Sequence, residues 1–466
     1  MVYSPLEDTE LNFNMTTHHS INALSPLDGR YFSQTNVLAN FFSESALLKY
    51  RLKIEIEYLI NFLPLSGQKK DVLTEQEKKE IRNIYLAFSD ADAAQIKDIE
   101  KKTNHDVKAV EYFLREKVAV ICPDLNLEMI HFGLTSQDIN NTAFPLMIKD
   151  AMEAILLPAI DHINQQLLER AKEWKGLALL AHTHGQPATP TNLGKEFMVF
   201  CERLSKQLEQ IKNTGYEGKF GGASGNFNAH KIAYPKHNWV EFGNTFLKNL
   251  GLNRQQFTTQ IEHYDNLAQL LDGLKRISTI LMDLCRDCWM YISMNYFIQK
   301  TKEGEVGSSA MPHKVNPIDF ENAEGNLGIC IALLEHLSAK LPISRLQRDL
   351  TDSTVLRNIG VPLGHLLIAL KSVEKGLGKL VPNEDRIRLD LENNWAIVAE
   401  AIQTILRREN FEHPYEALRK FSRGNRMLNR ESMNEFIEQL SVAENVKSEL
   451  RNISPFNYSG EYPDFK

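Results

Sequence analysis

The stretch of the sequence with the most chemically useful side chains is Gly307–Pro317, which reads G-S-S-A-M-P-H-K-V-N-P and follows Gly304. Its glycines permit hinge motion, Ser308 offers a hydroxyl, and Lys314 adds a cation that can bind a carboxylate or favour the ionised serine. The same composition is also typical of a plain linker between two helices. The functional interpretation accounts for more of the residues, so we expect a lid that carries a nucleophile or base.

A second candidate is Thr183–Pro190, which reads T-H-G-Q-P-A-T-P and follows an apolar run. Its His184 can donate or accept a proton near neutral pH. A lone histidine is more often structural than catalytic, but the Gly and Pro neighbours favour a non-helical, functional setting here. Both interpretations of His184 stay open at this point.

Three further segments are typical of helix N-termini: Thr103–Asp106, Thr135–Asp138 and Asp352–Thr354. Each can simply cap the helix that follows. Helix N-termini also bind anions, because their free N–H groups and the helix dipole attract phosphate or carboxylate. Nearby arginines would strengthen such sites through bidentate contacts, although a surface salt bridge is the plainer role for each. These arginines are Arg30, Arg348 and Arg357.

Neither a metal ion nor a cofactor is expected. His182 and His184 form an H-x-H pair, but no carboxylate or cysteine stands at a recognised metal spacing from them. Cys285 and Cys288 form a single C-x-x-C inside a helical pattern with no second pair, which favours a structural role.

Composition narrows the function classes further. The 466 residues are 43% hydrophobic and 24% charged, as in a globular protein, and the net charge of -7 argues against nucleic acid as a partner. Five cysteines are few and odd in number, which fits free thiols in a reducing cytosol. No run approaches the ~18 apolar residues of a membrane helix. We therefore expect a cytoplasmic protein that binds neither nucleic acid nor membrane.

Helices must position these candidates. Apolar residues recur at three- and four-residue spacing along most of the chain, and strand-like alternation is nearly absent, which predicts an all-α protein. Gln137–Trp174 and Glu262–Phe297 exceed the usual helix of about 8 to 20 residues and predict a long central bundle. Pro145 and Pro158 predict a kink or break in the first of them.

Gly-, Pro-, Ser- and Asn-rich stretches separate the helices and hold the candidate residues. These stretches are Ser25–Tyr31, His182–Pro190, Gly218–Asn228 and Gly304–Pro317. We expect three domains: an N-terminal helical domain with a loose N-terminal arm over 1–124, a central long-helix bundle for oligomerisation and the active site over 125–377, and a C-terminal helical domain over 378–466.

Together these segments resemble the fumarase/aspartase superfamily, whose shared signature is the G-S-S-x-M-P-x-K-x-N-P stretch at Gly307–Pro317. Within it the chain is similar to the bacterial-type adenylosuccinate lyase family from Ser25 to the C-terminus. The motifs that carry this similarity are Ser25–Tyr31 (S-P-L-D-G-R-Y), Thr103–Tyr112 (T-N-H-D-V-K-A-V-E-Y), Thr183–Pro190 and Leu350–Asn358 (L-T-D-S-T-V-L-R-N).

The resemblance implies an all-α, three-domain subunit that forms a homotetramer with shared active sites and needs no cofactor. It implies β-elimination of fumarate from adenylosuccinate, giving AMP, and from succinylaminoimidazole-carboxamide ribotide, giving AICAR, in purine nucleotide biosynthesis. It also implies Ser308 as the base, His184 as the acid and Glu321 as the group that orients His184. Lys314 and the backbone of Ser309–Met311 would stabilise the serine alkoxide.

The substrate-binding residues follow from the same resemblance. Thr135, Ser136, Lys314 and Asn316 resemble the carboxylate-binding set, and Arg30, Tyr31, Arg348, Ser353 and Arg357 resemble the groups that hold phosphate and ribose. Further predicted contacts are Asn104, His105, Asp106, Gln260, Ser309, Asn322 and Thr354. His105 stays ambiguous, because it can assist proton transfer or hydrogen-bond the phosphate or the purine.

Two alternatives remain at this stage. Another superfamily lyase, such as argininosuccinate lyase, would share Gly307–Pro317 but would need no phosphate site, and Arg30–Tyr31 and Ser353–Arg357 speak against it. A non-catalytic helical scaffold of the same fold is the second, since a fold alone never establishes function. The presence of both His184 and Ser308 argues against that scaffold.

Overall fold

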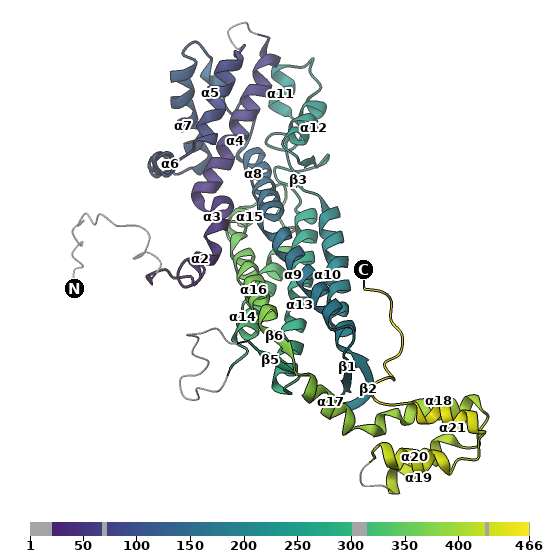
Figure 1. Cartoon of the computed structure of the whole chain (residues 1–466). Coiled ribbons are helices and arrows are strands. Elements are labelled where there is room, and N and C mark those ends of the chain that lie inside the picture. The colour runs from purple at the N-terminus through teal and green to yellow at the C-terminus, as the bar shows by residue number, and fades with distance from the viewer. Residues whose placement is uncertain (1–20, 68–71, 301–314, 425–427, 466) are drawn as a thin grey trace, which may run out of the picture. The chain divides into compact units, whose positions relative to one another are not determined.

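The computed structural model describes residues 21–67, 72–300, 315–424 and 428–465 (Figure 1). The described chain is mostly helical, which confirms the predicted fold class, and its few strands pair into small two-stranded sheets. It divides into two compact units. Unit 1 comprises the described residues of Met1–Ala159, Glu209–Ser278 and Asn326–Ala369, and unit 2 comprises Ile160–Leu208, Thr279–Gly325 and Leu370–Lys466.

Unit 1 contains most of the short and medium helices and the two short strands β3 and β4. They are α2 (Phe32–Thr35), η1 (Asn36–Leu38), α3 (Ala39–Phe42), α4 (Glu44–Phe62), η2 (Leu63–Ser66), α5 (Glu75–Leu86), α6 (Asp90–Thr103), α7 (Asp106–Ile121), η4 (Leu127–Met129), α8 (Ser136–Ala151), η5 (Met152–Leu156), β3 (Glu217–Gly218), α11 (Asn228–Ala233), α12 (Trp239–Asn249), β4 (Asn253–Arg254) and α15 (Thr351–Leu356).

Long helices contribute residues to both units, and the remaining elements belong to unit 2. The long helices are α9 (Leu157–Glu173), α10 (Leu193–Thr214), α13 (Asp265–Ser293), α14 (Ile318–Lys340) and α16 (Gly360–Lys379). Unit 2 adds β1 (Ala178–Thr183), β2 (Gln186–Asn192), β5 (Phe297–Gln299), β6 (Leu380–Pro382), α17 (Glu384–Glu392), η6 (Trp395–Val398), α18 (Ala399–Arg408), α19 (Pro414–Gly424), α20 (Arg430–Glu438) and α21 (Glu444–Arg451).

Helix α4 is the central helix of unit 1. Ser43 caps its start by accepting a hydrogen bond from the Ala46 amide, and α5, α6, α7 and α8 all pack against it. Its side chains are buried on every face, including the charged Arg51 and Glu55. A helix that is buried all round must provide partners for its polar groups inside the fold.

Helix α8 carries Pro145 in its interior without a break. A proline has no amide hydrogen, so the carbonyl of Asn141, four residues earlier, loses its helical partner. The backbone amide of Lys219 donates to that carbonyl instead, at 3.3 Å. The proline thereby creates an acceptor that attaches the strand β3 segment to α8.

The long helical run predicted from Gln137 to Trp174 is present, but it changes its winding. A π-helical turn, η5, separates α8 from α9, and Pro158 falls in the first turn of α9. Pro158 has no amide hydrogen to continue the helical bonding, and the winding changes in the turn just before it. The interruption therefore lies just before Pro158 and not at Pro145. The second predicted run, Glu262–Phe297, is shorter than expected, because α13 spans Asp265–Ser293.

One segment expected to be irregular, His182–Pro190, is instead largely strand. β1 and β2 pair antiparallel, with Thr183 opposite Gln186, so His184 and Gly185 form a two-residue hairpin turn. Both turn residues have positive φ, 54° for His184 and 73° for Gly185. This backbone matches the tight turns whose twist suits paired strands. The turn fixes where His184 projects.

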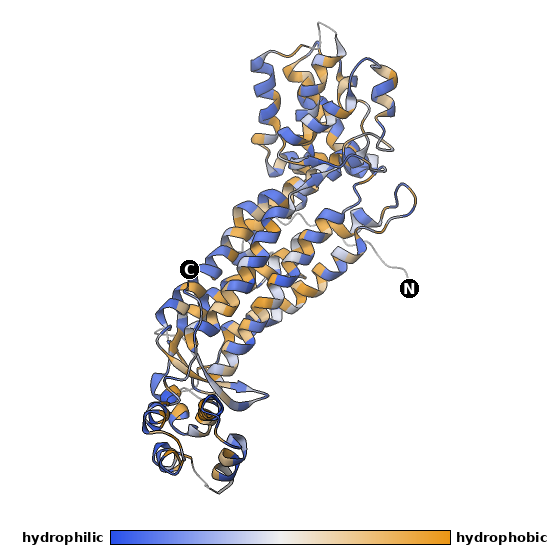
Figure 2. Ribbon diagram, turned by 90° about the vertical axis from the view of Figure 1, so that its right-hand side faces the viewer, coloured by the Kyte–Doolittle hydropathy of each residue, from blue (hydrophilic) through white to orange (hydrophobic). Residues whose placement is uncertain are grey.

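Apolar side chains form the interior of both units, and Figure 2 shows hydrophilic and hydrophobic residues on different faces of the helices. All five cysteines are buried and free, as the sequence predicts. Burial raises the pKa of the Cys201, Cys285 and Cys330 thiols to about 12. The C-x-x-C pair is part of the packed interior of α13.

The C-terminal helices of unit 2 share a core of their own. It is built by η6, α18, α19, α20 and α21, with Trp395, Ile402, Phe436 and Leu450 among its buried members. Each of these helices hides one apolar face, which is the pattern of a small helical layer.

Within the described residues, one stretch, Thr351–Lys379, is long and apolar enough to cross a membrane, with a mean hydropathy of 1.3 over its best window. Of that window, 61% is buried inside the fold. The core helix of a protein that never meets a membrane passes the same test, so this stretch is weak evidence for a membrane span.

Candidate active site

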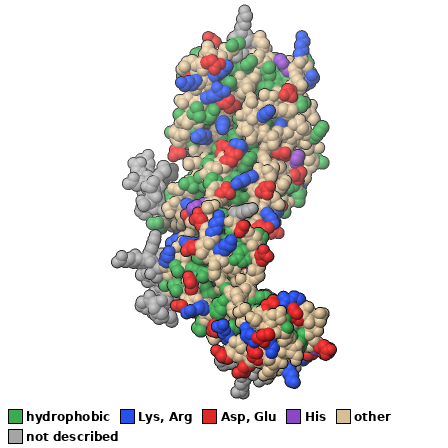
Figure 3. All heavy atoms as spheres, turned by 45° about the vertical axis from the view of Figure 1, so that its right-hand side comes forward, with side chains coloured by type: hydrophobic (Ala, Val, Ile, Leu, Met, Phe, Trp, Pro, Cys, Tyr) green, Lys and Arg blue, Asp and Glu red, His purple; other side chains and the backbone are tan. Residues whose placement is uncertain are grey.

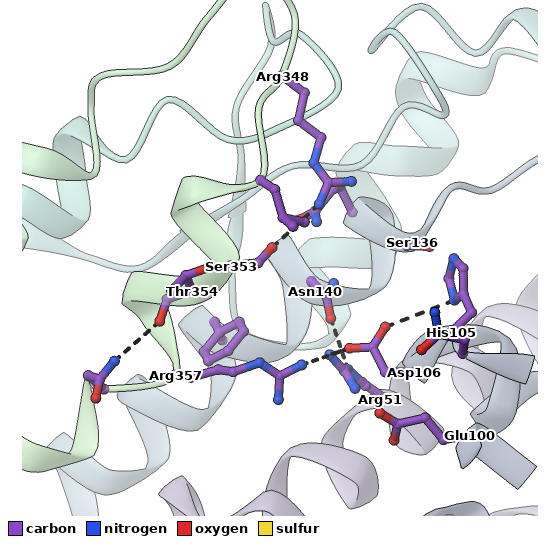
Figure 4. A pocket seen from close by; sticks show the side chains of 15 residues that line it. Arg51, Glu100, His105, Asp106, Ser136, Asn140, Arg348, Ser353, Thr354 and Arg357 are labelled. Atoms are coloured by element: carbon purple, nitrogen blue, oxygen red, sulfur yellow. Dashed lines mark hydrogen bonds and ion pairs between the residues drawn. The ribbon is translucent and has the colours of Figure 1, made fainter.

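One pocket in unit 1, of about 600 Å³, gathers eight of the residues predicted to bind substrate (Figure 4). These are Asn104, His105, Asp106, Ser136, Arg348, Ser353, Thr354 and Arg357. The pocket is also lined by Arg51, Glu100, Gln137, Asn140, Phe144, Leu350 and Asn358. Segments more than 200 residues apart in the sequence thus share one cavity.

The three predicted helix N-termini are real and all reach this pocket. α7 begins at Asp106 with His105 as its N-cap, α8 begins at Ser136 with Thr135 as its N-cap, and α15 begins at Thr351. Helix dipoles make such ends favourable for negative charge. The pocket is therefore suited to an anionic ligand.

Asp106 is held between two arginines (Figure 4). Its Oδ2 accepts from Arg51 Nη2 at 2.7 Å and from Arg357 Nη2 at 2.8 Å, while Oδ1 accepts from the Val107 amide at 2.8 Å. Burial alone would raise the pKa of Asp106, but the charges of the two arginines and the amide bond outweigh it and lower the pKa. Asp106 is thus a fixed anion at neutral pH.

Arg51 forms part of the pocket lining from the buried middle of α4. Its side chain is 2% exposed, and its Nε donates to Asn140 Oδ1 at 2.9 Å. Asn140 lies on α8 and Asp106 on α7, so this guanidinium ties three helices together beside the pocket. A buried charge of this kind is stable only when it is paired and hydrogen-bonded.

Arg348 has a different environment. Its Nη1 donates to Gln260 Oε1 at 3.2 Å and its Nη2 to Ser353 Oγ at 3.4 Å. No carboxylate of the described chain lies within ion-pair distance of it. Arg348 therefore brings an unopposed positive charge to the pocket, together with the neutral hydroxyl of Ser353.

Gln260 and Thr135 lie beside the pocket. Gln260 connects Arg348 to the loop Gly218–Asn228, because its Nε2 donates to the Ala223 carbonyl at 3.2 Å. That loop turns at Gly225, whose φ is +81° and whose Cβ would lie 2.5 Å from the Thr258 carbonyl oxygen, so only glycine fits. The loop positions Gln260, and Gln260 in turn positions the Arg348 guanidinium.

A buried ion pair supports the start of α8. Lys219 Nζ lies 2.7 Å from Asp138 Oδ1, and both side chains are fully buried. Asp138 also accepts from the amides of Thr135 and Gly221, each at 2.8 Å. Burial lowers the pKa of Lys219, and Asp138 opposes that effect. This pair fixes the turn that presents Thr135 and Ser136.

His105 is oriented by its capping role. Its Nδ1 accepts from the Lys108 amide at 3.1 Å, so the neutral ring carries its proton on Nε2. The side chain is 53% exposed. The ring can therefore offer an Nε2–H donor to a ligand while Nδ1 stays bonded to the helix.

Several predicted residues lie outside the pocket lining. Arg30 and Tyr31 precede α2, with the Arg30 guanidinium 5.9 Å from the Tyr31 ring centre. In unit 2, Glu321 accepts from the Trp289 indole at 3.1 Å and Asn322 accepts from Ser372 at 2.9 Å. His184 is exposed at the hairpin turn, also in unit 2.

Asn316 is half-buried just ahead of α14. Ser308, Ser309 and Lys314 lie outside the described residues, so the predicted base and its cation are not part of the geometry given above. Among the residues that the structure describes, no group of three or more His, Cys, Asp and Glu side chains could hold a metal ion.

The sequence analysis did not single out Arg51, Glu100, Asn140 or Phe144 as pocket residues. They sit inside regular helical patterns, where an arginine or asparagine is expected to face solvent. One signal was present: Arg51 falls between Tyr50 and Leu52 in a helix that is apolar on all sides. A charge in such a helix needs a buried partner.

The comparisons with known proteins identify the family of the chain. A protein-family model described as lyase matches residues 29–331, and one described as adenylosuccinate lyase C-terminal matches residues 344–459. The chain is therefore a lyase, and the more specific assignment follows from its relatives.

A curated adenylosuccinate lyase of Dictyostelium discoideum is 57% identical over 96% of this chain and 98% of its own length. The adenylosuccinate lyase of Escherichia coli K12 is 47% identical over 95% and 97%. The chain belongs to the adenylosuccinate lyase family, a family of carbon–nitrogen lyases.

Solved structures share the fold at lower identity. The 3-carboxy-cis,cis-muconate lactonizing enzyme from Pseudomonas putida superposes with a TM-score of 0.72 at 20% identity, covering 91% of this chain and 94% of that one. A fumarate lyase from Mesorhizobium sp. BNC1 gives 0.72 at 19%, covering 91% and 95%. These two similarities support the fold alone.

Proposed function

We propose that the chain eliminates fumarate from adenylosuccinate to release AMP, and from succinylaminoimidazole-carboxamide ribotide to release AICAR. Both substrates carry a phosphate and a succinyl group, and in both a C–N bond breaks. This reaction requires a base that removes a weakly acidic proton beside a carboxylate and an acid that protonates the leaving nitrogen.

The observation that carries this proposal is the pocket of about 600 Å³ in unit 1. It joins the Asn104–Asp106 segment, Ser136 and the Arg348–Arg357 region, which the sequence predicted separately as parts of one phosphate- and carboxylate-binding site. Arg348 supplies an unopposed cation, and Ser353 a hydroxyl, where the substrate's phosphate would bind. Lyases of non-phosphorylated substrates need no such group.

The assignment of the residues that transfer protons rests on the family resemblance. We assign Ser308 as the base, His184 as the acid and Glu321 as the orienting carboxylate, with Lys314 stabilising the serine alkoxide. Thr135, Ser136, Lys314 and Asn316 would bind the carboxylates, and each donor aimed at the developing charge would contribute about 3 to 4 kcal/mol. Arg30, Tyr31 and Gln260 would complete the nucleotide contacts.

The assembly follows from the same proposal. His184 and Glu321 belong to unit 2, whereas the pocket belongs wholly to unit 1. A homotetramer with active sites shared between subunits would bring together residues of both units from different chains.

We also propose the three-domain division at 124/125 and 377/378, a cytoplasmic location, and no nucleic-acid partner. Acidic and basic side chains are interspersed on the face that Figure 3 shows, which offers no basic stripe for a phosphate backbone.

The test is to add purified protein to adenylosuccinate and to record the change in ultraviolet absorbance. Released fumarate is measured in a separate assay. The parent should turn over, and His184→Ala and Ser308→Ala should lose at least about 100-fold in kcat, the usual contribution of a positioned acid or base. A matched control is His162→Ala, an exposed histidine paired with Glu374.

An inert parent enzyme would contradict the proposed substrate, and argininosuccinate and aspartate would then be assayed in the same way. Parent-like activity of either variant would remove that residue from the catalytic pair while leaving the substrate assignment intact.

A further inference from the structure

Arg357 belongs to an alternating row of six charges at the edge of the pocket. Arg357 Nη2 binds Asp106 at 2.8 Å and Nη1 binds Glu44 Oε2 at 2.9 Å. Glu44 also lies 3.2 Å from Lys97, which binds Glu100 at 2.6 Å. Arg51, on the other side of Asp106, completes the row. The row then contains three positive and three negative side chains, so their charges balance one another.

The two ends of this row differ in burial. The Arg51–Asp106 pair has side-chain exposures of 2% and 26%, and removing either partner would leave a buried charge. The Arg357–Glu44 pair has exposures of 40% and 41%, so water competes with it and its net strength is small. The Arg357–Glu44 contact is therefore the one that a ligand can replace.

Glu44 keeps other partners when Arg357 leaves it. Lys97 Nζ lies 3.2 Å from its Oε1, and Glu44 stands in the first turn of α4, where the helix dipole favours a carboxylate. Because Glu44 keeps these partners, Arg357 can turn to a new anion without leaving a bare negative charge behind.

We propose that Glu44 is a positioning residue that holds Arg357 in the empty pocket and competes with the substrate's phosphate for it. A phosphate carries nearly two negative charges at neutral pH and accepts bidentate bonds from a guanidinium. On binding, Arg357 exchanges Glu44 for the phosphate and keeps Asp106, while Glu44 stays with Lys97. This inference rests on the proposed function, because it takes a nucleotide monophosphate as the ligand.

The exchange makes the pocket selective. A nucleoside without phosphate cannot displace Glu44, so Arg357 stays neutralised and adds nothing to its binding. A nucleotide gains Arg357 at the expense of a weak, solvent-exposed pair. Removal of the Glu44 charge should therefore strengthen the binding of phosphorylated ligands alone.

The experiment compares Glu44→Gln with the parent by calorimetric titration of AMP and of adenosine, together with steady-state kinetics on adenylosuccinate. Loss of an exposed ion pair predicts that AMP binds about twofold to fivefold more tightly and that adenosine binding is unchanged. KM should fall by a similar factor while the chemical step, from single-turnover kinetics, stays the same. Glu44→Asp, which keeps the charge, should restore parent values.

The matched control is Glu57→Gln on the same helix, which removes a carboxylate paired with Arg82 and Tyr85 away from the pocket. It should leave AMP affinity at the parent value. Unchanged or weaker AMP binding in a folded Glu44→Gln, or equal tightening for adenosine, would overturn the inference. Absence of AMP binding to the parent itself would contradict the proposed function, and the inference with it.

Discussion

Two arginines in the pocket have unequal roles because their partners differ. Arg357 is compensated by Asp106 and Glu44, whereas Arg348 contacts only the neutral groups of Gln260 and Ser353 within the part of the chain that the structure describes. A charge without a counterion inside a pocket is available to a ligand at once. Arg348 should therefore contribute more to substrate affinity than to the stability of the fold.

The variant Arg348→Ala tests this difference. A lost hydrogen bond to a charged group is worth about 1.5 to 3 kcal/mol, so KM for adenylosuccinate should rise roughly 10- to 150-fold with little change in Tm. Steady-state kinetics and thermal melting measure both quantities. Arg345→Ala is the control, since Arg345 is 78% exposed and pairs with Asp349 on the same segment. A large drop in Tm with unchanged KM would instead make Arg348 structural.

Asp106 connects the pocket to the pH dependence of stability. Its pKa is lowered in the folded state, so its ion pairs stabilise the fold above the unfolded value of about 3.9 and lose that effect as pH falls through the lower folded value. Asp106→Asn should lower the urea midpoint at pH 7, and the difference from the parent should shrink below about pH 4.

The exposed pair Glu75–Lys78 provides the control for this comparison. Glu75→Gln should change the midpoint little at any pH, because such pairs are weak. An Asp106→Asn defect that is equally large at pH 7 and at pH 3.5 would indicate lost packing and not lost charge.

Residue-level prediction succeeded where the signal is local. A helix cap is predicted by a Ser, Thr, Asn or His residue just before a helical pattern. Helices α7 and α8 begin within the predicted segments Thr103–Asp106 and Thr135–Asp138. Arg51 and Glu44 were missed, because their roles depend on residues 55 and 313 positions away along the chain. No sequence window contains both partners.

At the scale of elements, the β1–β2 hairpin determines how His184 is presented. The sequence suggested an irregular segment there, because prolines at 187 and 190 weaken any strand pattern. The backbone between Ala178 and Asn192 nonetheless forms a pair of hydrogen-bonded strands. The turn between them places two consecutive residues at positive φ. His131 and His413 also have positive φ, so the turn conformation alone does not assign a role to His184.

Two variants separate the turn from the imidazole. Asparagine adopts positive φ readily, so His184→Asn should keep the parent Tm while kcat falls at least about 100-fold. A Cβ at position 185 meets nothing within 4 Å, so Gly185→Ala should cost about 1 kcal/mol through backbone strain alone and also lower kcat by displacing the turn. Thermal melting and kcat are the measurements. Full activity of His184→Asn would exclude His184 as the acid.

The helices show which structural features can be predicted from local sequence patterns and which cannot. Helices α8, α9 and α13 follow from apolar periodicity, whereas the π-helical turn between α8 and α9 does not. Pro145 and Pro158 each suggested a break, and only the surrounding fold decides between them: the Lys219 amide replaces the bond that Pro145 removes. Compensation by a distant segment is invisible to a local pattern.

At the scale of the whole molecule, the fold class and the family follow from the sequence, while the proposed active site draws on residues of both units. The pocket residues of unit 1 are brought together within one chain. His184 and Glu321 belong to unit 2, and the proposal places them against the pocket of another subunit.

A mixing experiment tests shared sites. His184→Ala and Ser308→Ala should each be inactive as pure proteins. After the two are unfolded together and refolded, some sites should combine an intact His184 with an intact Ser308, and a fraction of the parent kcat should return. Light scattering should show a tetramer in every sample. Inactivity of correctly refolded mixtures would indicate that each chain builds its own site.

The five buried thiols have a practical consequence. Because a thiol reacts as its thiolate and these groups are both hidden and raised in pKa, a thiol-reactive dye should label the folded protein very slowly. Each label that does appear reports a local opening: Cys201 for α10, Cys285 and Cys288 for α13, Cys330 for α14. Mass spectrometry of the labelled peptides over time would rank these helices by how often they open, with no engineered probe.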